Sequence, residues 1–172
     1  MKTKKQRELI DSFLAMLGAE DQPLYQELVL YLSGLGYNPK KERSNITFKH
    51  ELHNKQIVKI GIRGKKDSLP FFALRFSACQ NYSQRFAKVV SSAIVKFPKR
   101  VPGCLNNTCD YCAGKPESHV YTQTFPDGEQ KAHCGAYALE IPDIAWEDLA
   151  EIKLLILEEH EYLLKHEVSL FK

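Results

Sequence analysis

The sequence has 172 residues and a formal net charge of +3, with 44% hydrophobic, 26% charged and 10% aromatic residues. This composition is that of an ordinary globular protein, and it excludes a disordered chain, a collagen-like repeat and a disulfide-dense mini-protein. No apolar run approaches the roughly 18 residues that a membrane helix needs, and the N-terminus becomes acidic before a signal-peptide core could begin. We therefore expect a cytoplasmic protein with no membrane partner, with reduced cysteines, and with one domain over residues 1–172.

Charge is unevenly distributed along the chain. Residues 1–100 contain 19 Lys and Arg against 8 Asp and Glu, whereas residues 101–172 contain 5 against 13. Either the first part carries a basic surface for an anionic partner, or the two parts neutralise each other by packing together. We favour mutual packing as the simpler explanation.

Residues 1–40 are predicted to form a helical hairpin. Apolar residues recur at helical spacing in the first half, Thr3 and Gln6 have the spacing of a capping box, and Gly18 is a stop signal. A second apolar stripe follows at once and ends before Pro39.

Residues 44–100 change to a β pattern followed by a helix. Three runs of strand-forming residues, 46–48, 56–62 and 69–76, are separated by polar turns, which predicts an antiparallel meander of three strands. Apolar residues then recur at helical spacing over 82–97. We expect this helix to lie across the sheet and cover it.

Residues 101–140 contain the pattern that is most typical of a metal site. Cys104, Cys109 and Cys112 are followed by Cys134, and a Pro-Asp-Gly turn between them predicts a hairpin that returns Cys134 to the others. Two sulfurs from one Cys-x2-Cys turn can converge on zinc. The pattern predicts a zinc-ribbon-like, zinc-stapled β-hairpin with one structural Zn²⁺ per chain. Four cysteine ligands would leave no position for a catalytic water.

Other roles for these residues stay open. His133 could replace Cys134 as the fourth ligand, although neighbouring strand residues point to opposite faces. The cysteines could also be unrelated core residues, ligands of an iron–sulfur cluster or redox-active thiols. Cys79 lies outside the cluster and is expected to be a small buried apolar residue.

The last segment, residues 143–167, is predicted to be a long helix with Trp146 on its apolar face. Glu159 falls near that face, and we expect it at the edge. His160 and His166 are expected to be solvated among the many glutamates of the helix.

His50 and His53 flank a strand end and a turn. Alternating side chains on a strand do not project both rings to one side, so we do not expect these two residues to form a metal pair.

The C-terminal part of the chain resembles a known group. Cys-x4-Cys-x2-Cys, a Tyr-containing strand, Cys134-Gly135 and the closing Ile141-Pro142-Asp143-Ile144 before an acidic helix are similar to a group of small uncharacterised bacterial proteins with a cysteine-rich C-terminal segment. The resemblance covers about residues 101–165. It implies that the four cysteines act as a unit, and it implies no activity.

Together these patterns predict an α+β fold, with a helical hairpin, a β meander with a covering helix, a zinc-stapled hairpin and a long C-terminal helix. The sequence has no P-loop, no Gly-x-Gly-x-x-Gly, no nucleophile elbow and no His-Glu-x-x-His motif. We therefore interpret the chain as a zinc-stabilised, non-enzymatic binding module for a small molecule or protein partner. An enzyme whose groups come from distant strands is one alternative.

The second alternative is a nucleic-acid-binding regulatory protein, because the first part of the chain is basic and the chain is rich in Tyr and Phe. The residues that would carry this function are Arg63, Lys65, Lys66, Lys96, Lys99 and Arg100.

Overall fold

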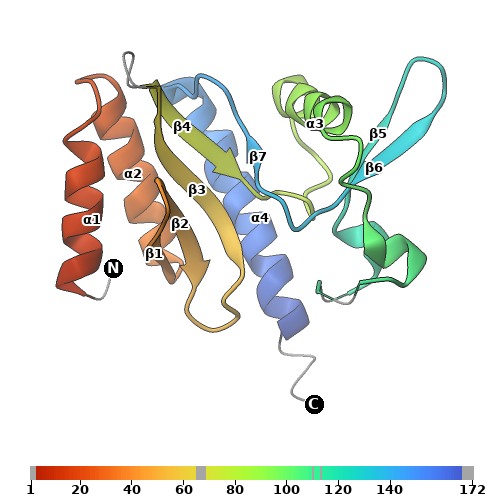
Figure 1. The fold of residues 1–172 in the computed structure, drawn as a ribbon, viewed down its shortest axis with the longest axis horizontal. Helices are drawn as coiled ribbons and strands as arrows, with labels where there is room; N and C mark the ends of the chain where they lie inside the picture. Colours follow the sequence, from red (N-terminus) through yellow and green to blue (C-terminus); the bar gives the residue numbers. More distant parts are fainter. Residues whose placement is uncertain (1–2, 65–68, 110, 113, 168–172) are drawn as a thin grey trace.

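The computed structural model describes residues 3–64, 69–109, 111–112 and 114–167, and its architecture is α+β (Figure 1). The sheet is antiparallel with strand order β1-β2-β3-β4-β7, and β5 and β6 form a separate hairpin. The strands are β1 (Tyr37–Glu42), β2 (Asn45–His50), β3 (Gln56–Arg63), β4 (Leu69–Leu74), β5 (Tyr121–Thr124), β6 (Gln130–His133) and β7 (Leu139–Glu140). The helices are α1 (Lys4–Leu14), α2 (Asp21–Gly34), α3 (Gln84–Lys96) and α4 (Leu149–Glu167), with 3-10 turns η1 (Gly103–Asn106), η2 (Pro116–Ser118) and η3 (Trp146–Asp148).

The predicted helical hairpin is present, and its start is the predicted capping box. The Gln6 N–H donates to Thr3 Oγ1 at 3.2 Å, and the Thr3 N–H donates to Gln6 Oε1 at 3.1 Å. Two of the otherwise unpaired N–H groups at the start of α1 are thereby satisfied. Phe13 of α1 packs edge-on against Tyr25 of α2, and Tyr25 against Phe72 of β4.

The meander has one more strand than predicted. The chain leaves α2 at Gly34, turns at Gly36 with a φ of +87°, and enters β1, which contains Pro39. We expected Pro39 to mark only the end of a helix. A proline is tolerated in β1 because this strand is at the edge of the sheet, where one side of its backbone forms no hydrogen bonds to another strand.

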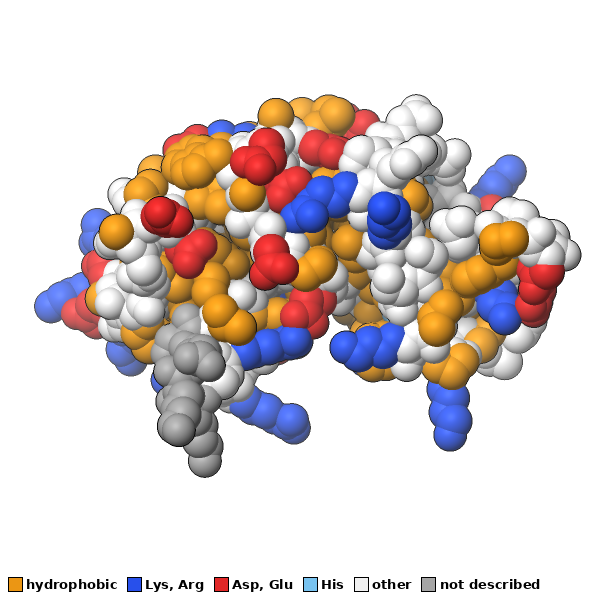
Figure 2. Space-filling view, turned by 90° about the horizontal axis from the view of Figure 1, so that it is seen from above, with side chains coloured by type: hydrophobic (Ala, Val, Ile, Leu, Met, Phe, Trp, Pro, Cys, Tyr) orange, Lys and Arg blue, Asp and Glu red, His pale blue; other side chains and the backbone are white. Residues whose placement is uncertain are grey.

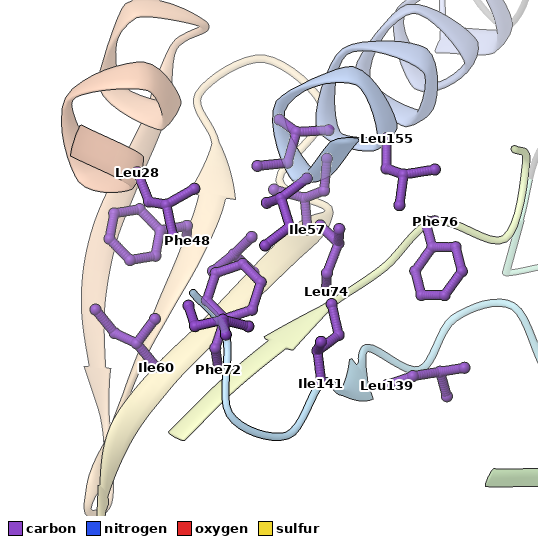
Figure 3. Packing of buried hydrophobic residues seen from close by; sticks show 14 of the residues in the cluster. Leu28, Phe48, Ile57, Ile60, Phe72, Leu74, Phe76, Leu139, Ile141 and Leu155 are labelled. Carbon is purple, nitrogen blue, oxygen red and sulfur yellow. The ribbon is translucent and has the colours of Figure 1, made fainter. Parts of the chain in front are cut away.

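Alternation along the strands gives the sheet a buried and an open face. The register aligns Phe48 with Val58 and Leu74, and all three side chains are buried. Leu28 of α2 lies against Phe48 on this face (Figure 3). The same register aligns Thr47 with Lys59, Ala73 and Glu140 on the opposite face. The apolar residues therefore fix which face is covered.

The helix that covers the sheet is not the predicted one. We expected α3 to lie across the meander, but α3 packs against β5, β6 and β7, and α4 is the helix in contact with β3. The apolar stripe of α3 instead meets the chain after β4, where Phe86 contacts Phe76 edge-on at 5.8 Å. The long C-terminal helix already occupies the place that the meander alone indicated for α3 (Figure 1).

The C-terminal helix begins later than predicted. A 3-10 turn, η3, precedes α4, and Trp146 lies in that turn with 53% of its surface exposed. The expectation that Trp146 contributes to the apolar face is therefore wrong. The buried stripe of α4 consists of Ile152, Leu155, Ile156 and Leu163. No helix among the described residues is long and apolar enough to span a membrane.

Candidate functional site

The open face of the sheet is the floor of a groove. Two adjoining cavities of about 630 and 460 Å³ share Arg63, Phe97 and Glu140 in their linings. Strands β3 and β4 supply the floor, α3 supplies one wall, and residues 136–140 with Tyr111 supply the other. Seen from above, the molecule has a notch with Lys and Arg side chains on both sides (Figure 2).

The groove is strongly basic. Its linings contain one carboxylate, Glu140, and seven cationic side chains: Lys49, Lys59, Arg63, Arg85, Lys88, Lys96 and Arg100. Three of these cations form ion pairs, Arg63 with Glu140, Arg85 with Asp148 and Lys49 with Glu42. The other four form no ion pair with a carboxylate of the described residues. The groove therefore carries about four uncompensated positive charges.

The structure brings together three of the six residues named for nucleic-acid binding. Arg63 on β3, Lys96 on α3 and Arg100 after α3 all line the groove. Lys99 is exposed but does not line either cavity. Lys65 and Lys66 lie outside the described residues.

The two oppositely charged parts of the chain also pack against each other. Ion pairs across the boundary at residue 100 join Arg63 to Glu140, Arg75 to Glu159, Arg85 to Asp148 and Lys153 to Glu27. This packing neutralises part of the charge split. The basic groove is what remains on the surface.

The four predicted zinc ligands lie around one small cavity of about 150 Å³ beside the groove. Cys104 is in η1, Cys109 and Cys112 are in the following loop, and Cys134 directly follows β6. Among the described residues, however, these cysteines do not bring three sulfurs within 4.8 Å of one another. The hairpin is as predicted, but the part of the chain that the structure describes does not contain the closed cysteine cluster of a zinc ribbon.

The backbone around this cavity is folded tightly. The Thr108 N–H donates to the Gly103 carbonyl at 2.9 Å, and Asn107 between them has a φ of +54°. A side chain at Gly135, next to Cys134, would place its Cβ 1.7 Å from the carbonyl oxygen of His119. Only glycine allows the two chain segments to approach this closely.

Two buried histidines border the cysteines on different sides. His119 lines the cysteine cavity, and its Nε2 is buried with no hydrogen-bond partner among the described residues. His133 lines another cavity instead, between the hairpin and α3. Cys134 and His133 therefore face opposite sides, as expected for neighbours at the end of a strand. His119 was not singled out by the sequence analysis.

A second group of side chains is the one that sequence reasoning missed. His50 at the end of β2, His53 in the following turn and His160 on α4 are all buried, and their ligand atoms lie within 4.8 Å of one another. The rings of His50 and His53 stack at 4.3 Å. This group could hold a metal ion. The expectations that His50 and His53 stay apart and that His160 is solvated are wrong.

The hydrogen bonds of His50 and His53 favour the tautomer in which Nε2 carries the proton and is not free to bind a metal. Burial lowers the pKa of all three histidines, that of His53 to about 4. Nδ1 of His50 accepts the Leu52 N–H, and Nδ1 of His53 accepts the Lys55 N–H. A neutral ring that accepts at Nδ1 carries its proton at Nε2. An ion at Nε2 would have to displace that proton and break the backbone contact.

A buried ion pair lies between the two groups. Glu159 is completely buried, not at the edge of the helix as expected, and Arg75 donates from Nε to its Oε1 at 2.6 Å. The Arg75 guanidinium also reaches Cys112 Sγ at 3.8 Å. Cys79 is buried as predicted and donates to the Leu155 carbonyl. The cysteine cavity therefore has a fixed positive charge beside it.

No family model, curated protein or solved structure matches this chain, so the fold and the side-chain geometry carry the functional argument.

Proposed function

We propose that the protein is a zinc-stabilised, non-enzymatic binding module in which Cys104, Cys109, Cys112 and Cys134 hold one structural Zn²⁺. The observation that carries the proposal is that all four cysteines line a single cavity of about 150 Å³. A zinc–sulfur bond is about 2.3 Å long, so the loop would close inward around the ion. The four sulfurs line one cavity but lie too far apart to coordinate one ion, and the closure would bring them together.

The surroundings of the cavity suit a zinc–thiolate centre. Four thiolates and one divalent ion have a net charge of about −2, and the Arg75 N–H that reaches Cys112 Sγ offsets part of it. The unpartnered Nε2 of His119 can donate to a thiolate in the same way. Burial raises the pKa of the Cys104 and Cys112 thiols. Metal binding would therefore release protons, as is usual for cysteine ligands.

The proposed zinc would stabilise one wall of the basic groove. Tyr111 and Tyr137 line both the cysteine cavity and the groove. The Cys134 N–H donates to the Arg100 carbonyl at 2.8 Å, and the Arg100 guanidinium lies 4.3 Å from the centre of the Tyr137 ring. An ion held by the cysteines would thus hold these three groove residues in place. Binding in the groove is the function that this arrangement supports best.

Metal analysis of purified protein tests the proposal. We expect about one zinc per chain, and we expect Cys109→Ser to lose the zinc and several kcal/mol of stability, because structural zinc contributes folding free energy directly. Cys79→Ser, outside the cavity, is the matched control and should retain the metal. His53→Ala should retain it as well.

Two results would contradict this proposal. One is protein prepared without chelator that contains no stoichiometric metal and whose four cavity cysteines all react freely with a thiol reagent, while the buried Cys79 does not. The other is zinc that survives Cys109→Ser but is lost in His53→Ala, which would place the metal at the histidines.

A further inference from the structure

We infer that the basic groove on the open sheet face is a binding site for single-stranded nucleic acid. This inference rests on the proposed function only in that zinc would hold the wall carrying Tyr111 and Tyr137. The groove combines exposed aromatic rings with cations that have no ion-pair partner among the described residues. Neither feature alone would identify the ligand.

The positive charge of the groove favours an anionic ligand, and its distribution along the groove favours one with several phosphates. Lys59, Lys88, Lys96 and Arg100 form no ion pair with a described carboxylate, and they come from the floor, one wall and the end of α3. Four cations at separate places in one groove fit successive groups of a chain better than a single small anion. Contacts of lysine and arginine with phosphates supply most of the affinity in sequence-independent nucleic-acid binding.

Aromatic rings in the groove provide surfaces on which bases can stack. Tyr111 and Tyr137 line the groove with 54% and 44% of their surface exposed. The Arg100 guanidinium lies between two rings, 3.8 Å from the centre of Phe97 and 4.3 Å from that of Tyr137. Arg100 therefore contributes its charge and holds Tyr137 in place, since Phe97 and Tyr137 already cover its faces. Exposed tyrosine rings beside such cations are typical of single-strand binding sites.

The aromatic rings decide between the kinds of polyanion. A duplex keeps its bases stacked on one another and presents mainly phosphates, so it would leave Tyr111 and Tyr137 unused. An acidic protein has carboxylates but no bases for these rings. Only a single strand uses both the cations and the rings.

Fluorescence anisotropy with labelled 15-mer oligonucleotides tests the inference. Single-stranded DNA and RNA of the same sequence should both bind more tightly than the duplex or polyglutamate. For four neutralised phosphates the slope of log affinity against log salt should be about −3, at roughly 0.7 per phosphate. DNA and RNA share the chemistry proposed here, and the two arms show which of them is preferred.

Charge reversals provide the matched variants. Lys88→Glu with Lys96→Glu, two exposed residues of α3, should lower the affinity at least tenfold and halve the salt slope to about −1.5. Lys4→Glu with Lys5→Glu, two exposed residues of α1 at the other end of the molecule (Figure 1), should leave both nearly unchanged. Tyr111→Leu should weaken single-strand binding at least fivefold. Circular dichroism and the midpoint of thermal unfolding show that each variant is folded.

Several outcomes would overturn the inference: no binding at 0.1 M salt, equal loss in the α1 and α3 reversals, or polyglutamate binding as tightly as the oligonucleotides. The last would indicate an acidic protein partner. Failure of the zinc proposal is seen separately in the metal analysis. Zinc-free protein that still binds single strands with the expected variant pattern would contradict the zinc site and support the groove.

Discussion

Arg75 and Glu159 form an ion pair inside the core, with Nε and Oε1 2.6 Å apart and side chains 2% and 0% exposed. The carboxylate also accepts the Ala78 N–H at 2.8 Å, and the guanidinium extends to Cys112 Sγ. One pair of charges thus connects the end of β4, helix α4 and the cysteine loop. The direct pairing, with the Ala78 and Ser77 hydrogen bonds to the carboxylate, lowers the cost of burying both charges.

Removing one partner of this pair should be costly. We expect Arg75→Met to lower the free energy of unfolding by about 3–5 kcal/mol, because it leaves the Glu159 charge buried without compensation. The double variant Arg75→Met with Glu159→Leu should recover part of this loss. Arg63→Met is the control, since the Arg63–Glu140 pair is largely exposed and should cost less than about 1 kcal/mol. Urea unfolding measures all three, and equal losses at Arg75 and Arg63 would contradict the argument.

Gly135 should be the glycine least tolerant of a side chain. A Cβ there would lie 1.7 Å from the His119 carbonyl oxygen, so Gly135→Ala must push two backbone segments apart. We expect a loss of about 2–4 kcal/mol and weaker zinc retention. Gly34→Ala at the end of α2 meets nothing within 4 Å and should change stability by less than about 1 kcal/mol. Thermal unfolding of the two variants, side by side, checks this.

The buried His119 should make stability depend on pH. Burial, with the nearby Arg75 and His166 charges, lowers the pKa of His119 below its ordinary value, although the Lys115 carbonyl and Glu117 oppose the shift. The unfolded chain therefore binds the His119 proton at a pH where the folded chain does not, and folding loses stability as the pH falls below about 6.5.

The comparison of wild-type protein with His119→Gln isolates this effect. The stability difference between the two should be largest near pH 8 and should shrink toward about pH 5, with zinc held at one concentration throughout. Denaturant unfolding at several pH values measures it. A difference that stays constant with pH would show that the histidine acts only through packing.

Cobalt substitution should distinguish the two candidate metal centres. Co²⁺ bound by four cysteines should give intense sulfur-to-metal charge-transfer absorption and leave no exchangeable water. A spectrum without sulfur bands would indicate the histidine group, and three sulfurs with an exchangeable oxygen would reopen the possibility of a catalytic ion. Cys112→Ser should weaken the sulfur bands, because one of the four thiolate ligands is lost, and His160→Ala should leave them unchanged.

Much of the fold follows from local patterns. Thr3 and Gln6 predicted the cap of α1 because both partners lie within one helical turn. Val58 and Ile60 of β3 share the face that packs on the helices because side chains alternate along any strand, although their neighbour Ile57 is buried as well. Pro39 misled the prediction because a proline ends a helix but is also accepted in an edge strand, and edge position is not a local property.

Some signals of the missed residues are present in the sequence. Alternation from Ile46 through Phe48 places His50 on the buried face of β2, and Arg75 interrupts a strongly apolar run. Each pattern indicates a buried polar group that needs a partner. Neither identifies the partner, which in both cases is on α4.

The sequence by itself determined the α+β class, the start of the first helix, the alternation of the strands and the set of four cysteines, because each depends on residues close together in the chain. Only the tertiary structure decided which helix covers the sheet, that Arg75 meets Glu159 84 positions away, that His160 joins His50 and His53, and that a basic groove remains on the open face. These depend on the competition of distant segments for the same buried surface. Local periodicity carries no information about that competition.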